Sequence, residues 1–349
     1  MPTCFSTHLG MCSDPRSRDE AVSPTIADYC AAAETAAEAW GLGPVSARLL
    51  NLSENVVLRL DGERGPLVMR LHRPGYNSLA ELESEVAWVS ALRDGGVSGP
   101  VAVPSADGSF YRPVEITSTG GEAEARYAGV IEWIGGKQLR EWMAEGDGDI
   151  VPHFAALGRV MGRIRTHGRT WEPPATFVRR RWDADGFVGE SPIWGRFWEA
   201  SWLTPERHRL FSEARDQLTS ELGGAPRDED AFGMIHADLH LANVMVDGSA
   251  LTVIDFDDSG WGWAGFELAV ALHEVVEEPE FEAARDALLT GYADVAGLDD
   301  RVEAMVDTFI TVRALMLVGW LADRPEVADR ERIETLTSQA ESRCRLYLA

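Results

Sequence analysis

Alternating apolar and polar positions over residues 47–74 predict two or three short antiparallel strands. These runs are separated by the turn signals Asp61-Gly62 and Arg64-Gly65-Pro66. A further apolar run, Val130 to Ile134, predicts a buried strand that ends at a pair of glycines. The first part of the chain therefore has the pattern of a small antiparallel sheet.

Apolar residues at helical spacing predict helices before and after these strands. A helix rich in alanine and glutamate is expected from Thr25 to Trp40, and a helix with one apolar stripe over residues 78–94. Further helices are expected over residues 151–168, 280–295, 300–322 and 326–347. The later part of the chain is therefore mostly helical.

Residues 244–254 predict a β-hairpin. Two apolar runs rich in β-branched residues, Val244 to Val246 and Leu251 to Ile254, flank the turn signal Asp247-Gly248. Polar residues lie at both ends of this hairpin. The preceding loop carries His236, Asp238, His240 and Asn243, and the second strand is followed by Asp255, Asp257 and Asp258.

The predicted hairpin can bring the carboxylates of Asp238 and Asp255 and the amide of Asn243 to one point. Transfer of a phosphoryl group requires a positioned hydroxyl and Mg²⁺ on the phosphates. Carboxylate and amide oxygens are suited to both tasks. Asp and Asn also favour turns without any chemistry. The whole pattern, rather than any one residue, therefore indicates a nucleotide kinase.

The sequence HADLHLAN, residues 236–243, followed by IDFDD, residues 254–258, resembles the catalytic and metal loops of protein kinases, HRDxxxxN and DFG. It is more similar to the branch that contains the aminoglycoside phosphotransferases and choline kinases. The resemblance covers about residues 49–271.

This resemblance implies an α+β, two-lobed, protein-kinase-like fold that binds ATP and Mg²⁺. A small antiparallel-sheet N-lobe is expected over residues 24–134, and a larger, mostly helical C-lobe over residues 135–349. Residues 1–23 are expected to form a loose tail.

The resemblance also implies roles for the loop residues. Asp238 is expected to orient and deprotonate an acceptor hydroxyl, with His236 bracing its loop. Asn243 and Asp255 are expected to hold Mg²⁺. His240 stands where protein kinases have a phosphate-contacting lysine. A γ-phosphate contact and an ordinary loop histidine both remain open for it.

Three acidic residues near these loops have implied or open roles. Glu267 matches an aspartate of the related phosphotransferases and is expected to prop the catalytic loop. Asp257 and Asp258 either extend the metal site or lie at its rim.

Arg70 stands at the strand position where the kinases have a phosphate-contacting lysine. Arginine keeps the charge and can form a two-pronged contact with phosphate. Glu85, on the following helix, is expected to pair with Arg70, and Glu81, one turn earlier, is the alternative.

The segment Asn51 to Asn55 replaces the glycine-rich loop of protein kinases. Ser53, Asn55 and backbone N–H groups are therefore expected to cover the phosphates. By the same resemblance, the main chain of Glu132, Trp133 and Ile134 is expected to flank the adenine.

Residues 171–202 are rich in tryptophan and phenylalanine and contain three consecutive arginines, Arg179 to Arg181. Insertions at this place precede the catalytic loop in the antibiotic and choline kinases. An acceptor-pocket wall and an ordinary aromatic core both remain open.

The chain has 57 acidic and 32 basic residues and a formal net charge of −25. This balance disfavours nucleic acid and anionic membranes as partners, because their phosphates attract basic surfaces. It favours a cationic substrate, although acidity can also serve solubility alone.

The apolar run from Met305 to Leu321 is the best membrane candidate, but Asp307 and Arg313 interrupt it, so it predicts a buried helix. The four cysteines show no paired metal spacing, and the first twenty residues lack the apolar core of a signal peptide. A cytoplasmic protein is expected.

The expected function is ATP-dependent phosphorylation of a hydroxyl on a small-molecule acceptor, with an antibiotic placed first. A homoserine or choline-type metabolite and a protein serine or threonine, as in stress-response kinases, are the alternatives. A weakly catalytic nucleotide-binding pseudokinase is a different class, which the altered glycine loop and Arg70 keep open.

Overall fold

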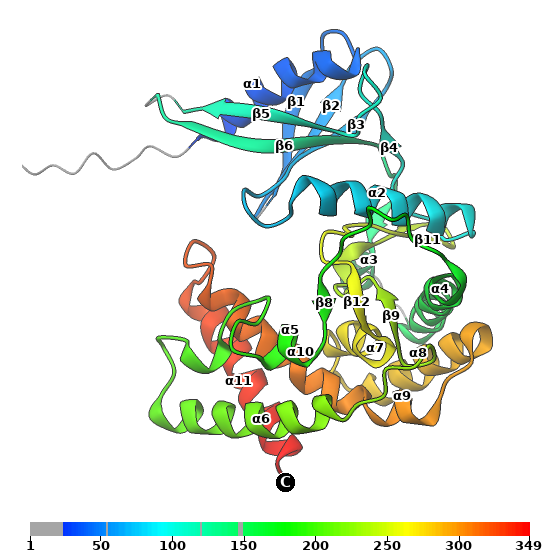
Figure 1. Ribbon diagram of the computed structural model, residues 1–349, viewed down its shortest axis with the longest axis vertical. Helices are drawn as coiled ribbons and strands as arrows, with labels where there is room; N and C mark the ends of the chain where they lie inside the picture. Colours follow the sequence, from blue (N-terminus) through cyan, green and yellow to red (C-terminus); the bar gives the residue numbers. More distant parts are fainter. Residues whose placement is uncertain (1–23, 54, 119–120, 146–148) are drawn as a thin grey trace, which may run out of the picture.

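The computed structural model describes residues 24–53, 55–118, 121–145 and 149–349. The expected tail, residues 1–23, lies outside the described residues. The described chain forms a sheet lobe and a larger helical lobe, and helix α2 lies between them (Figure 1). This architecture confirms the predicted two-lobed α+β fold.

The sheet lobe contains one antiparallel sheet with strand order β1-β2-β3-β6-β4, and β5 also pairs with β6. On β2, alternate residues are fully buried, which is the period of a strand with one face against a core. Helix α1 covers that face with Tyr29 and Ala33. The elements are α1 (Ile26–Ala36), the 3₁₀ turn η1 (Ala37–Trp40), β1 (Ser46–Leu52), β2 (Val56–Asp61), β3 (Leu67–Leu71), β4 (Ala102–Val103), β5 (Tyr111–Thr117) and β6 (Ala123–Glu132).

Helix α2 (Leu79–Asp94) follows β3 but packs on the helical lobe. Ser78 caps its first turn in a reciprocal arrangement with Glu81. Its buried Trp88 and Val89 belong to the same core as the helical lobe, and the Trp88 ring meets that of Phe256 edge-on at 5.6 Å between centroids. The helix is therefore fixed to the segment that carries the predicted metal loop.

The helical lobe carries the predicted hairpin. Strands β10 and β11 pair as expected across the Asp247-Gly248 turn, and β7 adds a third strand. The elements are β7 (Lys137–Gln138), α3 (Leu139–Glu145), α4 (Val151–Thr170), β8 (Arg181–Trp182), α5 (Ala184–Val188), η2 (Phe197–Glu199), α6 (Pro205–Gly223), β9 (Phe232–Ile235), η3 (Leu241–Asn243), β10 (Val244–Asp247), β11 (Ala250–Val253), β12 (Gly260–Trp263), α7 (Ala264–His273), α8 (Phe281–Ala296), α9 (Asp300–Ala304), α10 (Val306–Ala322) and α11 (Arg330–Tyr347).

The helix expected over residues 300–322 is two helices, α9 and α10, which meet at Met305. The N–H of Met305 bonds to the carbonyl of Val302, a three-residue step that interrupts the α-helical pattern. As predicted, α10 is buried. Within the described residues, no helix is long and apolar enough to cross a membrane.

Helices α4 and α8 approach each other closely through two glycines. A Cβ atom on Gly158 would lie 2.1 Å from the carbonyl oxygen of Leu288, and one on Gly291 would lie 2.1 Å from that of Ala155. Since real Cβ atoms do not approach oxygen so closely, only glycine fits at these two points.

Candidate active site

The loop before β10 is held from below by Glu267 on α7. Its two carboxylate oxygens accept hydrogen bonds from the backbone N–H groups of His236, at 2.8 Å, and Ala237, at 2.9 Å. Ala237 has a φ of 68°, a conformation that side chains rarely adopt. Burial raises the pKa of Glu267 to about 7, although the two hydrogen bonds oppose this shift. These contacts agree with the expected propping role.

His236 is fully buried behind the loop. Its Nε2 lies 3.0 Å from the carbonyl oxygen of Ile254, and its Nδ1 accepts a hydrogen bond from the backbone N–H of Asp238 at 3.3 Å. Burial lowers the pKa of this imidazole, which favours the neutral ring. His236 thus ties the start of the loop to the end of β11.

Asp238 has a partner on each carboxylate oxygen. Oδ1 accepts a hydrogen bond from Nη2 of Arg313 at 2.6 Å, and Oδ2 lies 3.3 Å from Nδ2 of Asn243 and 3.4 Å from Nε2 of His240. Burial alone would raise the pKa of Asp238, but His240 and Arg313 hold it below its usual value. The group is therefore a carboxylate at neutral pH.

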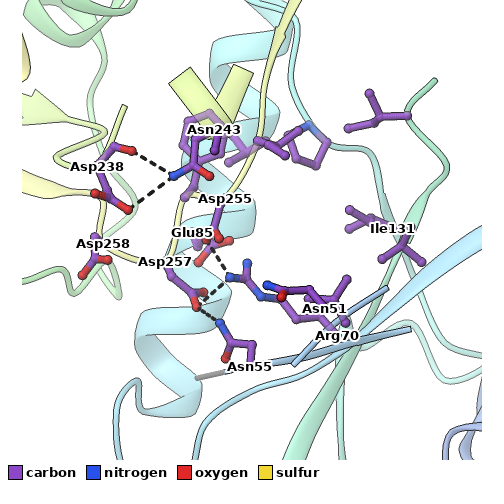
Figure 2. Close-up of a pocket in the computed structure, with 18 of the residues that line it drawn as sticks. Asn51, Asn55, Arg70, Glu85, Ile131, Asp238, Asn243, Asp255, Asp257 and Asp258 are labelled. Carbon is purple, nitrogen blue, oxygen red and sulfur yellow. Dashed lines mark hydrogen bonds and ion pairs between the residues drawn. The ribbon is translucent and has the colours of Figure 1, made fainter. Parts of the chain in front are cut away.

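The amide of Asn243 points toward Asp238, and Asp255 lies between Asn243 and Arg70 in this view (Figure 2). The amide nitrogen of Asn243 is taken up by the backbone and side-chain oxygens of Asp238, at 2.9 and 3.3 Å, which leaves its Oδ1 for another ligand. Asp255 directly follows Ile254, has a φ of 64°, and its side chain is 41% exposed. Asn243 Oδ1 and the second carboxylate oxygen of Asp255 thus remain open at the cavity, while Asp255 Oδ1 is paired with Arg70.

Arg70 reaches the metal loop instead of α2. Its Nη2 lies 2.6 Å from Oδ1 of Asp255 and 3.0 Å from Oδ2 of Asp257. The expected pair between Arg70 and Glu85 is therefore wrong, and so is the alternative with Glu81, whose carboxylate caps the first turn of α2. Figure 2 shows the Arg70 guanidinium pointing toward the two aspartates.

Glu85 pairs with Arg179, whose side chain is fully buried, at 3.8 Å between Oε2 and Nη1. Burial, reinforced by the nearby Asp257, raises the pKa of Glu85 to about 8. Arg179 also donates to the carbonyl oxygens of Ser259, at 2.6 Å, and Phe256, at 2.9 Å. The sequence placed Arg179 in the aromatic segment but not at the site.

Asp257 was left open by the sequence and lies at the centre of the site. Its Oδ2 accepts a hydrogen bond from Nδ2 of Asn55 at 2.6 Å, and the Asn55 Oδ1 accepts from the backbone N–H of Arg73 at 2.9 Å. Asn55 is therefore engaged within the protein at both ends. Ser53 also lines the cavity.

A cavity of about 700 Å³ connects these groups. Trp133 and Ile134, after β6, line it, while Glu132 is not among its lining residues. The guanidinium of Arg59 lies 4.5 Å from the centre of the Trp133 ring. An apolar slot is formed between the lobes by Val57, Val68, Ile131, Met245 and Ile254.

The far side of the cavity is walled by Trp194 and by α10, through Leu317 and Trp320. Within residues 171–202, Trp194 is the one residue that lines this cavity. Of the other large aromatic side chains there, Trp182, Phe187, Phe197 and Trp198 are buried in the core, and Trp171, Phe177 and Trp202 are partly buried and pack against it. The segment is thus mostly core, with one aromatic side chain at the site.

Comparisons with known proteins agree with this geometry. The model of the phosphotransferase enzyme family matches residues 47–304. The amicoumacin kinase of Bacillus subtilis (strain 168) is 26% identical over 299 residues, which are 82% of this chain and 82% of the relative.

Solved structures are also similar. A microcompartment-associated aminopropanol kinase is 32% identical, with a TM-score of 0.78 over 90% of this chain and 96% of the other. An amicoumacin kinase in complex with AMP-PNP, Ca²⁺ and Ami has a TM-score of 0.69 at 20% identity, over 85% of this chain and 88% of the other.

The two-lobed fold and the loops at the cavity define a phosphotransferase of the protein-kinase-like class. The chain belongs to the phosphotransferase enzyme family and is an ATP-dependent small-molecule kinase. The resemblance to the aminoglycoside phosphotransferases and choline kinases is thereby confirmed.

Proposed function

We propose that the protein transfers the γ-phosphoryl group of ATP to a hydroxyl of a small molecule, with an antibiotic as the first candidate acceptor. The observation that carries the proposal is the cavity that joins Asp238, Asn243 and Asp255 to the wall formed by Trp194 and Trp320. The activity named for the Bacillus subtilis relative, an amicoumacin kinase, supports an antibiotic.

An amino alcohol is the second candidate. The higher identity to an aminopropanol kinase, 32%, favours it. Asp258 and Glu274 also line the acceptor side of the cavity, where carboxylates would attract an ammonium group.

The open oxygen groups fit a magnesium ion. Asn243 Oδ1 and the Asp255 carboxylate are hard oxygen ligands, and Mg²⁺ commonly binds through one or two protein groups together with substrate phosphates. Consistent with this mode, the described residues contain no group of three or more His, Cys, Asp or Glu that would hold a metal alone. When bound, the ion would neutralise charge on the phosphates.

In this proposal, Asp238 orients the acceptor hydroxyl and takes its proton, while His236 holds the loop in shape. Arg70 leaves part of its contact with Asp255 to meet the phosphates, for which its planar guanidinium is suited. His240, 3.4 Å from Asp238, stands where a γ-phosphate contact is open to it.

The nucleotide would lie between the lobes, with the base in the apolar slot. The main chain of Trp133 and Ile134 would bond the base, and Ser53 with its neighbouring N–H groups would cover the phosphates. Asn55 would serve by fixing this turn to Asp257, since both ends of its amide are engaged.

An ATP-consumption screen tests the proposal. The panel contains antibiotics, amino alcohols, homoserine and a generic protein substrate, each assayed with the wild type, Asp238→Asn and the control Asp247→Asn at the exposed hairpin turn. We expect turnover with a small hydroxyl compound that falls by at least about 1,000-fold in Asp238→Asn only. Phosphorylation of the protein substrate alone would overturn the proposal in favour of a protein kinase. No turnover with any compound would overturn it in favour of a pseudokinase.

A further inference from the structure

Arg313 is a charged residue in the middle of α10, a helix whose other charged residue, Asp307, lies in its first turn. Only 4% of the residue is exposed. A buried guanidinium is costly unless it is paired, because it loses its hydration. Its presence in this helix therefore calls for a specific partner.

That partner is Asp238. Nη2 of Arg313 lies 2.6 Å from Oδ1 of Asp238, and the guanidinium carbon lies 4.8 Å from the centre of the Trp194 ring. Among the described residues, Asp238 is the one carboxylate in an ion pair with Arg313, and Nη1 has no hydrogen-bond partner. Both residues line the cavity.

The two oxygens of the Asp238 carboxylate have different partners. Oδ1 is held by Arg313, whereas Oδ2 faces Asn243 and His240 at the longer distances of 3.3 and 3.4 Å. Both contacts are longer than an ordinary charge-assisted hydrogen bond, so Oδ2 can exchange one of them for a short hydrogen bond donated by the hydroxyl of the phosphoryl acceptor.

We propose that Arg313 is a positioning residue that holds Asp238 by Oδ1 and so directs Oδ2 to the acceptor hydroxyl. The inference rests on the proposed function. In the transfer, the acceptor oxygen forms the new bond to the γ-phosphorus, its proton passes to Oδ2, and the β–γ bridging oxygen leaves with ADP. Arg313 itself contacts Asp238 and not the reacting atoms.

Kinetics of Arg313→Met and Arg313→Lys test this role. Arg313→Met should lower kcat by about 100-fold, the loss typical of a misplaced reacting group, and leave the KM for ATP within about threefold. Arg313→Lys should recover part of kcat, because an ammonium keeps the charge but not the planar geometry. Arg285→Met, which removes an arginine of α8 that pairs with Asp307, is the matched control and should keep full kcat.

A double-mutant cycle separates positioning from a merely structural role. If Arg313 acts through Asp238, adding Arg313→Met to Asp238→Asn should change the residual rate by less than about threefold. Equal losses in the two backgrounds would overturn the inference. Thermal unfolding of each variant identifies any that fail to fold. If Arg313→Met does not fold, the cycle is repeated with Arg313→Lys, which keeps the buried positive charge.

A crystal structure of Arg313→Met decides the question independently of the acceptor. We expect the Asp238 carboxylate to rotate away from Asn243. An unchanged position of the Asp238 carboxylate would overturn the inference, whether or not an acceptor in the panel is phosphorylated. A panel in which no acceptor is phosphorylated would reject the proposed function, not the positioning of Asp238 by Arg313.

Discussion

Asp255, Asp257 and Asp258 lie within five residues of the end of β11, and their surroundings differ. Asp255 is partly exposed at the cavity, whereas Asp257 is buried beneath Arg70 and Asn55. Burial would raise the pKa of Asp257, but Arg70, His72 and Asn55 hold it below its usual value. Burial raises the pKa of Asp258 to about 6, although Arg180 opposes the shift. Of the three, Asp255 has by far the most exposed side chain, 41% against 6% for Asp257 and 12% for Asp258, so it is the best placed to hold a metal ion.

Asp255→Ala should therefore abolish Mg²⁺-dependent nucleotide binding. The change deletes a charged ligand from an ion that prefers hard oxygen, so we expect the Kd of MgATP to rise by at least about 100-fold, and by less in Asn243→Ala. Isothermal titration calorimetry measures both values. Asp247→Ala, which removes an exposed aspartate of the same hairpin, is the control. Undiminished affinity in Asp255→Ala would reject the metal assignment.

Glu85→Gln should be mild at neutral pH, since a carboxyl with a pKa of about 8 is mostly protonated at pH 7 and glutamine has nearly its shape. We expect kcat within about threefold of wild type, whereas Arg70→Ala should lose about 100-fold in kcat/KM for ATP. A loss in Glu85→Gln as large as that in Arg70→Ala would show that Glu85 acts as a carboxylate.

The same substitution has a signed effect on stability. In the unfolded chain Glu85 releases its proton near pH 4.5, but in the folded protein only near pH 8. The contribution of Glu85 to the unfolding free energy of the wild type is therefore complete below about pH 4.5 and is lost progressively as the pH rises to about 8. Denaturant unfolding should show Glu85→Gln gaining stability relative to wild type over that window.

At the scale of elements, the contact of α4 with α8 depends on glycine. Gly158→Ala would place a methyl group 2.1 Å from a backbone oxygen, which cannot move without shifting α8. We expect a loss of about 2–3 kcal/mol in unfolding free energy, larger than the gain of up to about 1 kcal/mol from alanine's helix propensity.

Gly223→Ala is the matched control for that prediction. Gly223 ends α6, and nothing lies within 4 Å of its missing Cβ. This variant should be neutral or slightly stabilised in the same denaturant titration. Equal stability of the two variants would mean that α4 and α8 separate at little cost.

The hairpin and most helices could be predicted because their signals are local. Asp247-Gly248 marks the turn between β10 and β11, and helical spacing marks α2 and α10. The break at Met305 was missed, since no glycine or proline stands there.

The ion pairs that complete the site could not be predicted. Arg313 and Asp238 are 75 residues apart, and Arg70 and Asp255 are 185 apart. Such contacts depend on tertiary packing and leave no periodic pattern. The one available signal was a lone arginine inside an apolar run, which needs a partner wherever the helix is buried.

At the scale of the whole molecule, the net charge of −25 should influence acceptor binding. If the acceptor is cationic, its KM should rise as salt increases from about 0.1 M to about 1 M, because the screening length falls from about 10 Å to about 3 Å. Steady-state kinetics at both salt concentrations measure this effect. A neutral hydroxyl compound from the panel should show a nearly constant KM, and a flat response for a cation would indicate that its binding is not electrostatic.

The segment over residues 171–202 also limits how this enzyme can be re-engineered. It supplies Trp194 to the wall of the cavity, and its Arg179 holds the backbone of the metal loop through Phe256 and Ser259. A graft of the corresponding segment from a relative that lacks this arginine would thus replace Trp194 and loosen the metal loop at the same time. Grafts that retain Arg179 should keep their turnover. The acceptor can therefore be changed without loss of activity only by replacing residues that follow Arg179 in the segment.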